Sequence, residues 1–147
     1  MADFMTGFRV SSSGMAAQRM RLNTISSNLA NINTTRTPEG GPYRRKDVIF
    51  ESMPEVKNFG EILSVNSPQS QIQRVQVSDI ISDTKAPILK YEPENPDANE
   101  DGYVAYPNIN LMEEMTNMIQ ATRAYEANVS ALNASKDMAL SALEIGR

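Results

Sequence analysis

The chain has 147 residues, no cysteine, no histidine and a formal net charge of -4. These values exclude disulfide and thiol chemistry and remove the commonest general base and transition-metal ligand. The acidic balance gives no reason to expect a nucleic-acid partner, and no apolar run reaches the roughly 18 residues of a membrane span. The sequence also holds no catalytic triad pattern, phosphate-binding glycine loop or metal-ligand cluster. We therefore expect no enzyme, no catalytic or metal site, no cofactor and no small-molecule substrate.

Residues 1–35 form the first expected element, a helical arm. Its apolar side chains follow steps of three and four once Ser11 and Gln18 are included, a pattern we call the N-terminal ladder: Phe4, Phe8, Met15, Leu22, Ile25, Leu29 and Ile32. Glycine, serine and asparagine are frequent between them, and a break in the helix is expected near Ser13. Because such a helix depends on packing, the arm should order only when it meets its partners. Its first apolar stretch is too short for a secretory signal.

Residues 36–107 differ in character, since all eight prolines lie between Pro38 and Pro107. Turn-forming segments separate three expected strands, at residues 43–50, 72–81 and 88–91. Residues 58–71 are expected to be a loop. The basic run Arg44-Arg45-Lys46 is interpreted as a solvated strand end. This part of the chain therefore predicts a small β-rich insert.

One motif in the insert resembles the opening of a calcium-binding loop, Asp97-x-Asn99-x-Asp101-Gly102. A complete loop needs a bidentate carboxylate six residues after the glycine, where Asn108 stands. The proline-rich residues 92–96 cannot supply the incoming helix. A polar turn is the favoured interpretation, and calcium binding stays the alternative.

Residues 108–147 form the third expected element, a long helix from Asn108 to Ile145. Its apolar residues form the C-terminal ladder, which is continuous if Thr122 and Lys136 are included: Leu111, Met115, Met118, Tyr125, Val129, Leu132, Ala139 and Leu143. Asn110 is the expected N-cap. Such a helix is about 57 Å long, too long for one small core to cover. The ladder therefore predicts packing against the N-terminal arm or other copies of the chain, although an ordinary globular helix pair is also possible.

The expected fold is mainly α, with the N- and C-terminal helices packed as a coiled coil and the small β-rich insert between them. Three segments follow from this: an N-terminal helical arm at 1–35, the insert with its loops at 36–107, and the C-terminal helix at 108–147.

Both ends of the chain also resemble a known family. Residues 13–22 (Ser-Gly-Met-Ala-Ala-Gln-Arg-Met-Arg-Leu) and 25–35 are similar to the N-terminal signature of bacterial flagellar axial proteins. Residues 106–110 and 119–128 (Ile-Gln-Ala-Thr-Arg-Ala-Tyr-Glu-Ala-Asn) are similar to their C-terminal signature. The Ala30-Asn31-x-x-Thr34 core is typical of rod and hook proteins.

The resemblance implies a structural subunit of the proximal rod, which polymerises through its terminal helices to build the drive shaft for motility. It implies export through the flagellar type III system into the periplasmic rod. The implied partners are copies of the chain, other rod proteins, the basal-body export gate and hook–basal-body components. A cytosolic coiled-coil adaptor with a calcium-binding insert is the alternative.

The ladders and the resemblance together identify the residues expected at assembly and packing contacts. They are Met15, Leu22, Ile25, Asn28, Leu29, Ala30, Asn31, Ile32, Thr34, Leu111, Met115, Met118, Arg123, Tyr125, Glu126, Asn128, Val129 and Leu132.

Overall fold

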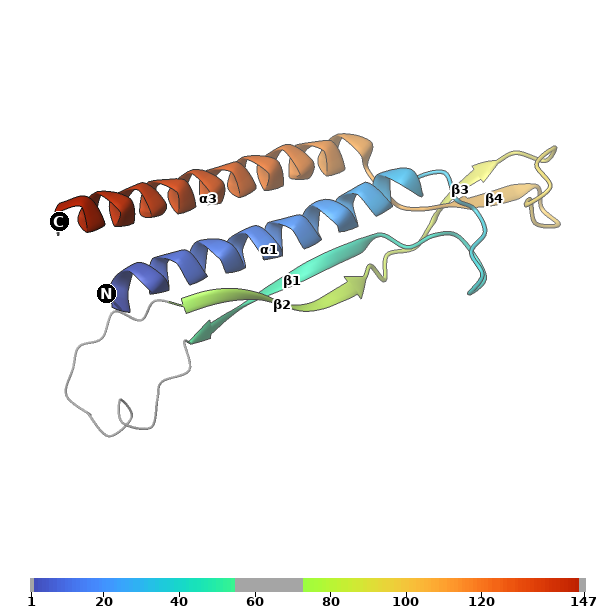
Figure 1. Cartoon of the computed structure of the whole chain (residues 1–147). Helices are drawn as coiled ribbons and strands as arrows, with labels where there is room; N and C mark the ends of the chain where they lie inside the picture. The colour runs from blue at the N-terminus through green and yellow to red at the C-terminus, as the bar shows by residue number, and fades with distance from the viewer. Residues whose placement is uncertain (1, 55–72, 146–147) are drawn as a thin grey trace.

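The computed structural model describes residues 2–54 and 73–145. The chain has one long helix near each end and two small antiparallel hairpins between them (Figure 1). A little under half of the chain is helical, so helices are the largest component, as expected. Within the described residues, no helix combines the length and the apolar character needed to cross a membrane.

The first helix, α1 (Ala2–Ala30), is continuous, so the expected break near Ser13 is wrong. The hydroxyl of Ser13 donates to the carbonyl of Val10 at 2.7 Å and accepts from the amide of Val75 at 3.2 Å. Both bonds satisfy the serine without opening the helix, and tertiary contacts override the weak helix propensity of this stretch.

The last helix, α3 (Leu111–Ile145), begins three residues later than expected. Its predicted cap is confirmed, because Oδ1 of Asn110 accepts from the amides of Met112 at 3.0 Å and Glu113 at 3.4 Å. These two bonds satisfy amides that have no partner within the first turn of a helix.

Two hairpins separate the helices. Strand β1 (Lys46–Pro54) pairs with β2 (Gln73–Ser82), and the register shifts once between Ile49 and Phe50. Strand β3 (Ile88–Tyr91) pairs with β4 (Tyr103–Tyr106). The first three strands lie close to their predicted positions, whereas β4 was not predicted as a strand. The expected loop at 58–71 lies outside the described residues.

The elements pack in layers with α1 in the middle. Helix α3 lies along one side of α1, and the β1–β2 hairpin lies along another (Figure 1). The β3–β4 hairpin extends from the end where α1 stops and α3 starts, and it packs against no other helix or strand of the described part. The molecule is therefore elongated and thin.

Few side chains are fully covered in so thin a molecule. The buried residues of the described part are Ala17, Thr24, Ile25, Asn28, Val104, Pro107, Ile109, Glu114 and Ala121. Many large apolar side chains stay exposed on both helices and both hairpins. Exposed apolar surface of this extent is typical of a chain that binds other chains.

Candidate assembly interface

Two contacts define how the terminal helices align. The side chain of Asn28 on α1 donates to Glu114 on α3 at 3.1 Å. Gly14 on α1 lies so close to Asn128 on α3 that an added Cβ would stand 2.9 Å from the Asn128 side-chain oxygen. The two contacts are fourteen residues apart on each helix, about 21 Å, and they run in opposite chain directions. The helices are therefore antiparallel.

The row of α3 that faces α1 is polar and small, not apolar. Glu114, Ala121 and Asn128 recur at steps of seven, and the first two are the buried residues of the described part of α3. On α1, Gly14 and Asn28 face them at the same spacing. We call these two sets the inner rows. Small side chains allow the helix backbones to approach closely.

The apolar ladders lie beside the inner rows. Each step from an inner-row residue of α3 to the residue four positions later, such as Asn128 to Leu132, turns about 40° around the helix. On α1, Ile25 and Ile32 are turned from the row of Asn28 by a similar angle around the helix axis and in the same rotational sense. Because the helices are antiparallel, both offsets point to the same side of the pair, opposite the side where Ser13 bonds β2. The two ladders thus form one face.

This face is only partly covered within one chain. Of the expected assembly residues, Ile25 and Asn28 are buried. Those that are half-buried are Met15, Leu22, Leu29, Asn31, Ile32, Thr34, Met118, Tyr125, Asn128, Val129 and Leu132. Those that are exposed are Ala30, Leu111, Met115, Arg123 and Glu126.

Asn31 and Thr34 act in the turn that follows α1. The hydroxyl of Thr34 donates to Oδ1 of Asn31 at 3.1 Å, and the Asn31 amide donates to the carbonyl of Ser27 at 2.9 Å. The carbonyl of Thr34 accepts from the amide of Tyr43 at 3.0 Å. These bonds return the chain toward the start of β1.

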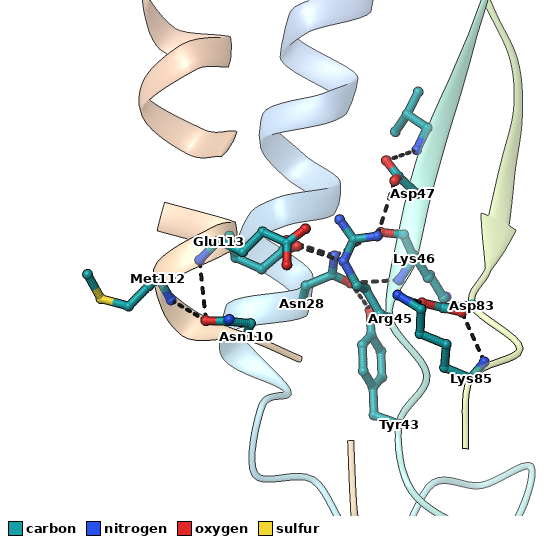
Figure 2. A network of polar contacts seen from close by, with 12 residues as sticks. Asn28, Tyr43, Arg45, Lys46, Asp47, Asp83, Lys85, Asn110, Met112 and Glu113 are labelled. Carbon is teal, nitrogen blue, oxygen red and sulfur yellow. Dashed lines mark hydrogen bonds and ion pairs between the residues drawn. The ribbon is translucent and has the colours of Figure 1, made fainter. Parts of the chain in front are cut away.

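Asn28 is the centre of a buried polar cluster (Figure 2). Its side chain is 0% exposed and makes four hydrogen bonds. Nδ2 donates to the carbonyl of Lys46 at 2.8 Å and to Glu114 at 3.1 Å. Oδ1 accepts from the amide of Lys46 at 2.9 Å and from the hydroxyl of Tyr43 at 3.1 Å. All the hydrogen-bonding capacity of the amide is used.

Glu114 completes the cluster and is 1% exposed. Its Oε1 accepts from Nε of Arg45 at 2.7 Å, and Arg45 also pairs with Asp47 at 3.1 Å. Burial acts to lower the pKa of Arg45, but its hydrogen bonds to Glu114 and Asp47 outweigh burial and raise that pKa above its ordinary value. A buried charge of this kind is stable only with a partner. The interpretation of Arg45 as part of a solvated strand end is therefore wrong.

We define the Asn28 cluster as Asn28, Tyr43, Arg45 and Glu114. It joins the end of α1, the start of β1 and the first turn of α3, three segments far apart in the sequence. Of these four residues, the sequence placed only Asn28 among the expected assembly and packing contacts. The sequence signal for Glu114 was its position two steps of seven before Asn128. This repeat was overlooked because the apolar repeat of the same helix is stronger.

The residues of the calcium-like motif serve the turn between β3 and β4. Oδ2 of Asp97 accepts from the hydroxyl of Thr35 at 2.7 Å. Oδ1 of Asn99 accepts from the amide of Tyr103 at 2.8 Å. Gly102 adopts a φ of 79°, which suits glycine at this position. The motif therefore acts as the polar turn that the sequence favoured.

The comparisons with known proteins match both terminal helices and nearly the whole chain. Residues 8–36 match the family described as "Flagella basal body rod protein", and residues 100–145 match "Flagellar basal body rod FlgEFG protein C-terminal". The flagellar basal-body rod protein FlgC of Borreliella burgdorferi is 45% identical, with 95% of each chain covered. The FlgC protein of Bacillus subtilis is 44% identical, covering 97% of this chain and 100% of its own. The chain belongs to the FlgC family of flagellar basal-body rod proteins.

The resemblance seen in the sequence is thus confirmed. FlgC of Aquifex aeolicus, at 38% identity over 94% of this chain, belongs to the same group of relatives. Asn28 and Glu114 both lie within the matched segments, at opposite ends of the chain. As a FlgC-family member, the chain is a structural, non-enzymatic subunit of the flagellar basal-body rod.

Proposed function

We propose that the chain polymerises through the face that carries its two apolar ladders, and that it does so in the proximal rod, where it forms part of the drive shaft. The observation that carries this proposal is the partial burial of the ladders. Within one chain, the helices meet through the polar and small inner rows, and large side chains such as Tyr125 and Leu132 stay half-exposed beside them. Neighbouring subunits would cover this face and remove its apolar surface from water.

A coiled-coil arrangement of the terminal helices is part of the proposal. The inner row of α3 recurs at steps of seven, the repeat that keeps a seam facing its partner, and the two inner-row residues of α1 are two such steps apart. The antiparallel alignment of α1 and α3 also limits which ladder residues can meet within one chain. Val129 and Leu132 lie beside the first half of α1, because Gly14 stands next to Asn128. Their packing against Leu29 or Ile32 would require a neighbouring chain.

The three segments have separate roles in this proposal. The arms at 1–35 and 108–147 form the polymer, and the insert at 36–107 contacts neighbours on the outside. The partners would be copies of the chain, other rod proteins, the export gate and hook–basal-body components. Export would use the flagellar type III system, with the rod in the periplasm. Family membership and the residues that resemble the axial signatures support these assignments.

The substitution Leu132→Asp tests the proposal. A carboxylate on the ladder face would be desolvated in the polymer, so incorporation into basal bodies and swimming motility should both be lost. Export should persist, so the variant should still appear in the secreted fraction. Immunoblots of isolated basal bodies and of the secreted fraction would measure both effects.

Ser130→Asp provides the matched control. Ser130 is exposed and lies two positions away on a different side of α3, so this variant should assemble and swim normally. Normal rods in cells carrying Leu132→Asp would count against the ladder face as the assembly surface.

A further inference from the structure

The β1–β2 hairpin is a sheet of two strands, so each strand has an outer edge. Strand β2 has 10 residues, and within the described part of the chain no third strand pairs with it or with β1. Three β-branched side chains of the hairpin are well exposed, Ile49 at 43%, Ile80 at 40% and Ile81 at 46%. A long edge strand with exposed side chains of this kind is a template on which a strand of another chain can add.

The hydrogen-bond pattern of the hairpin shows which backbone amides point outward. In an antiparallel pair, residues that bond each other alternate with residues whose amides and carbonyls face away from the partner strand. Lys46 is of the second kind, because its amide and its carbonyl both bond Asn28 of α1 and not Ser82, its partner in the register. Val48 and Ile80 pair with each other two residues further along, so their amides also point outward.

Each of these two outward amides is bonded by the aspartate that precedes it. Oδ1 of Asp79 accepts from the amide of Ile80 at 2.7 Å. Oδ1 of Asp47 accepts from the amide of Val48 at 2.9 Å. Because Val48 and Ile80 are partners in the register, the two carboxylates close opposite edges of the hairpin at the same level.

Helix α1 lies along the hairpin and caps other outward amides (Figure 1). Asn28 bonds Lys46 on β1, and the hydroxyl of Ser13 accepts from the amide of Val75 on β2 at 3.2 Å. Asp79 is exposed, as are its neighbours Ile80 and Ile81, so this part of β2 is accessible to another chain.

We propose that Asp47 and Asp79 keep the hairpin two-stranded by occupying the outward amides of Val48 and Ile80. An added strand must place a carbonyl oxygen on such amides. Here a carboxylate oxygen already bonds each amide, and a charged acceptor makes a stronger hydrogen bond than a neutral carbonyl. The proposal rests on the geometry of the hairpin and is independent of the proposed function.

Asp79 is the residue on which to test the proposal, because Asp47 also pairs with Arg45. The purified full-length chain carrying Asp79→Ala should form strand-rich aggregates with a lag time several-fold shorter than that of the natural chain, measured by thioflavin T fluorescence. Asp79→Asn keeps a side-chain oxygen for the Ile80 amide but loses the charge, and it should match the natural chain. Glu51→Ala removes one charge at an exposed position of β1 and should also match it.

A double variant separates an uncapped amide from a loss of folding. Asp79→Ala combined with Ile80→Pro removes the cap and the N–H group together, and proline is tolerated where the amide of an edge strand takes no part in the ladder. This variant should return to the lag time of the natural chain. Equal lag times for Asp79→Ala and Glu51→Ala, or for Asp79→Ala and Asp79→Asn, would overturn the proposal. Rapid aggregation of the double variant would overturn it as well.

Discussion

An amide at position 28 serves the fold in a way that few other side chains can. Asn28 donates to the carbonyl and accepts from the amide of the same residue, Lys46, as a neighbouring strand would. It also reaches Tyr43 and Glu114 from that position. Asn28 thereby fixes the start of β1 against both helices.

Replacing Asn28 by alanine should destabilise the assembled chain strongly. The change removes the side-chain partner of Oε2 of Glu114 and of the backbone amide and carbonyl of Lys46, at about 1–3 kcal/mol for each group left unsatisfied. The measurement is the urea concentration at which half of the chain leaves isolated basal bodies. Asn23→Ala, at an exposed site on the same helix, should leave that midpoint nearly unchanged. Equal midpoints for the two variants would remove the structural role given to Asn28.

The β3–β4 hairpin contains a pH-sensitive pair. The hydroxyl of Tyr106 donates to Glu92 at 2.8 Å, and together with a bond from Asn95 this lowers the pKa of Glu92 below its ordinary value. The bond to Glu92 also raises the pKa of Tyr106. A carboxyl whose folded pKa is lowered stabilises the hairpin above its unfolded pKa, and this stabilisation is lost as the pH falls through the folded pKa.

Tyr106→Phe should therefore raise the pKa of Glu92 toward its ordinary value. Carbon NMR titration of the Glu92 carboxyl in the labelled full-length chain measures the shift. The pKa of Asp83, which is lowered chiefly by a backbone bond from Lys85, serves as the internal control and should not move. An unchanged Glu92 titration would show that Tyr106 does not hold this carboxylate.

At the scale of elements, the two glycines of α1 make a matched pair. A Cβ at Gly14 would stand 2.9 Å from the Asn128 side chain, whereas a Cβ at Gly7 would meet nothing within 4 Å. Alanine favours a helix over glycine by about 0.8–1.0 kcal/mol. Gly7→Ala should therefore stabilise the helix pair, and Gly14→Ala should not.

A substitution on α3 should relieve the crowding that Gly14→Ala creates. Asn128→Ala removes the atoms that the new Cβ would meet, so Gly14→Ala combined with Asn128→Ala should recover the helical gain relative to Asn128→Ala alone. Urea midpoints of the assembled variants give the comparison. A stabilising Gly14→Ala single variant would contradict the close approach of the two helices.

Local sequence signals predicted the elements whose structure depends on residues close together in the sequence. The cap at Asn110 and the ladder of α3 follow from residues a few positions apart, and both strands of the β1–β2 hairpin follow from the turn-forming segments that bound them. The expected break near Ser13 failed because Val75, distant in sequence, supplies the bond that holds the serine. Strand β4 was missed because four residues after a polar turn show too little alternation, and its pairing with β3 defines it.

At the scale of the whole molecule, periodicity predicted that the two ends pack together but not which rows meet. Apolar residues give the stronger repeat, so the ladders were expected to pack on each other within one chain or between copies. The polar and small inner rows, which supply the contacts of Asn28 with Glu114 and of Gly14 with Asn128, were not expected. Arg45 and Glu114 could not be paired from sequence, because a buried ion pair is recognised only when burial is known. Under the proposed function, the ladders lie on the face that neighbouring chains cover.

Imaging of isolated basal bodies by electron cryomicroscopy tests this account most directly. The account predicts density for α1 and α3 as an antiparallel pair within the rod, joined through Asn28 and Glu114, with neighbouring chains covering Tyr125, Val129 and Leu132. Rod density in which the two helices separate, or in which these ladder residues face open solvent, would contradict it.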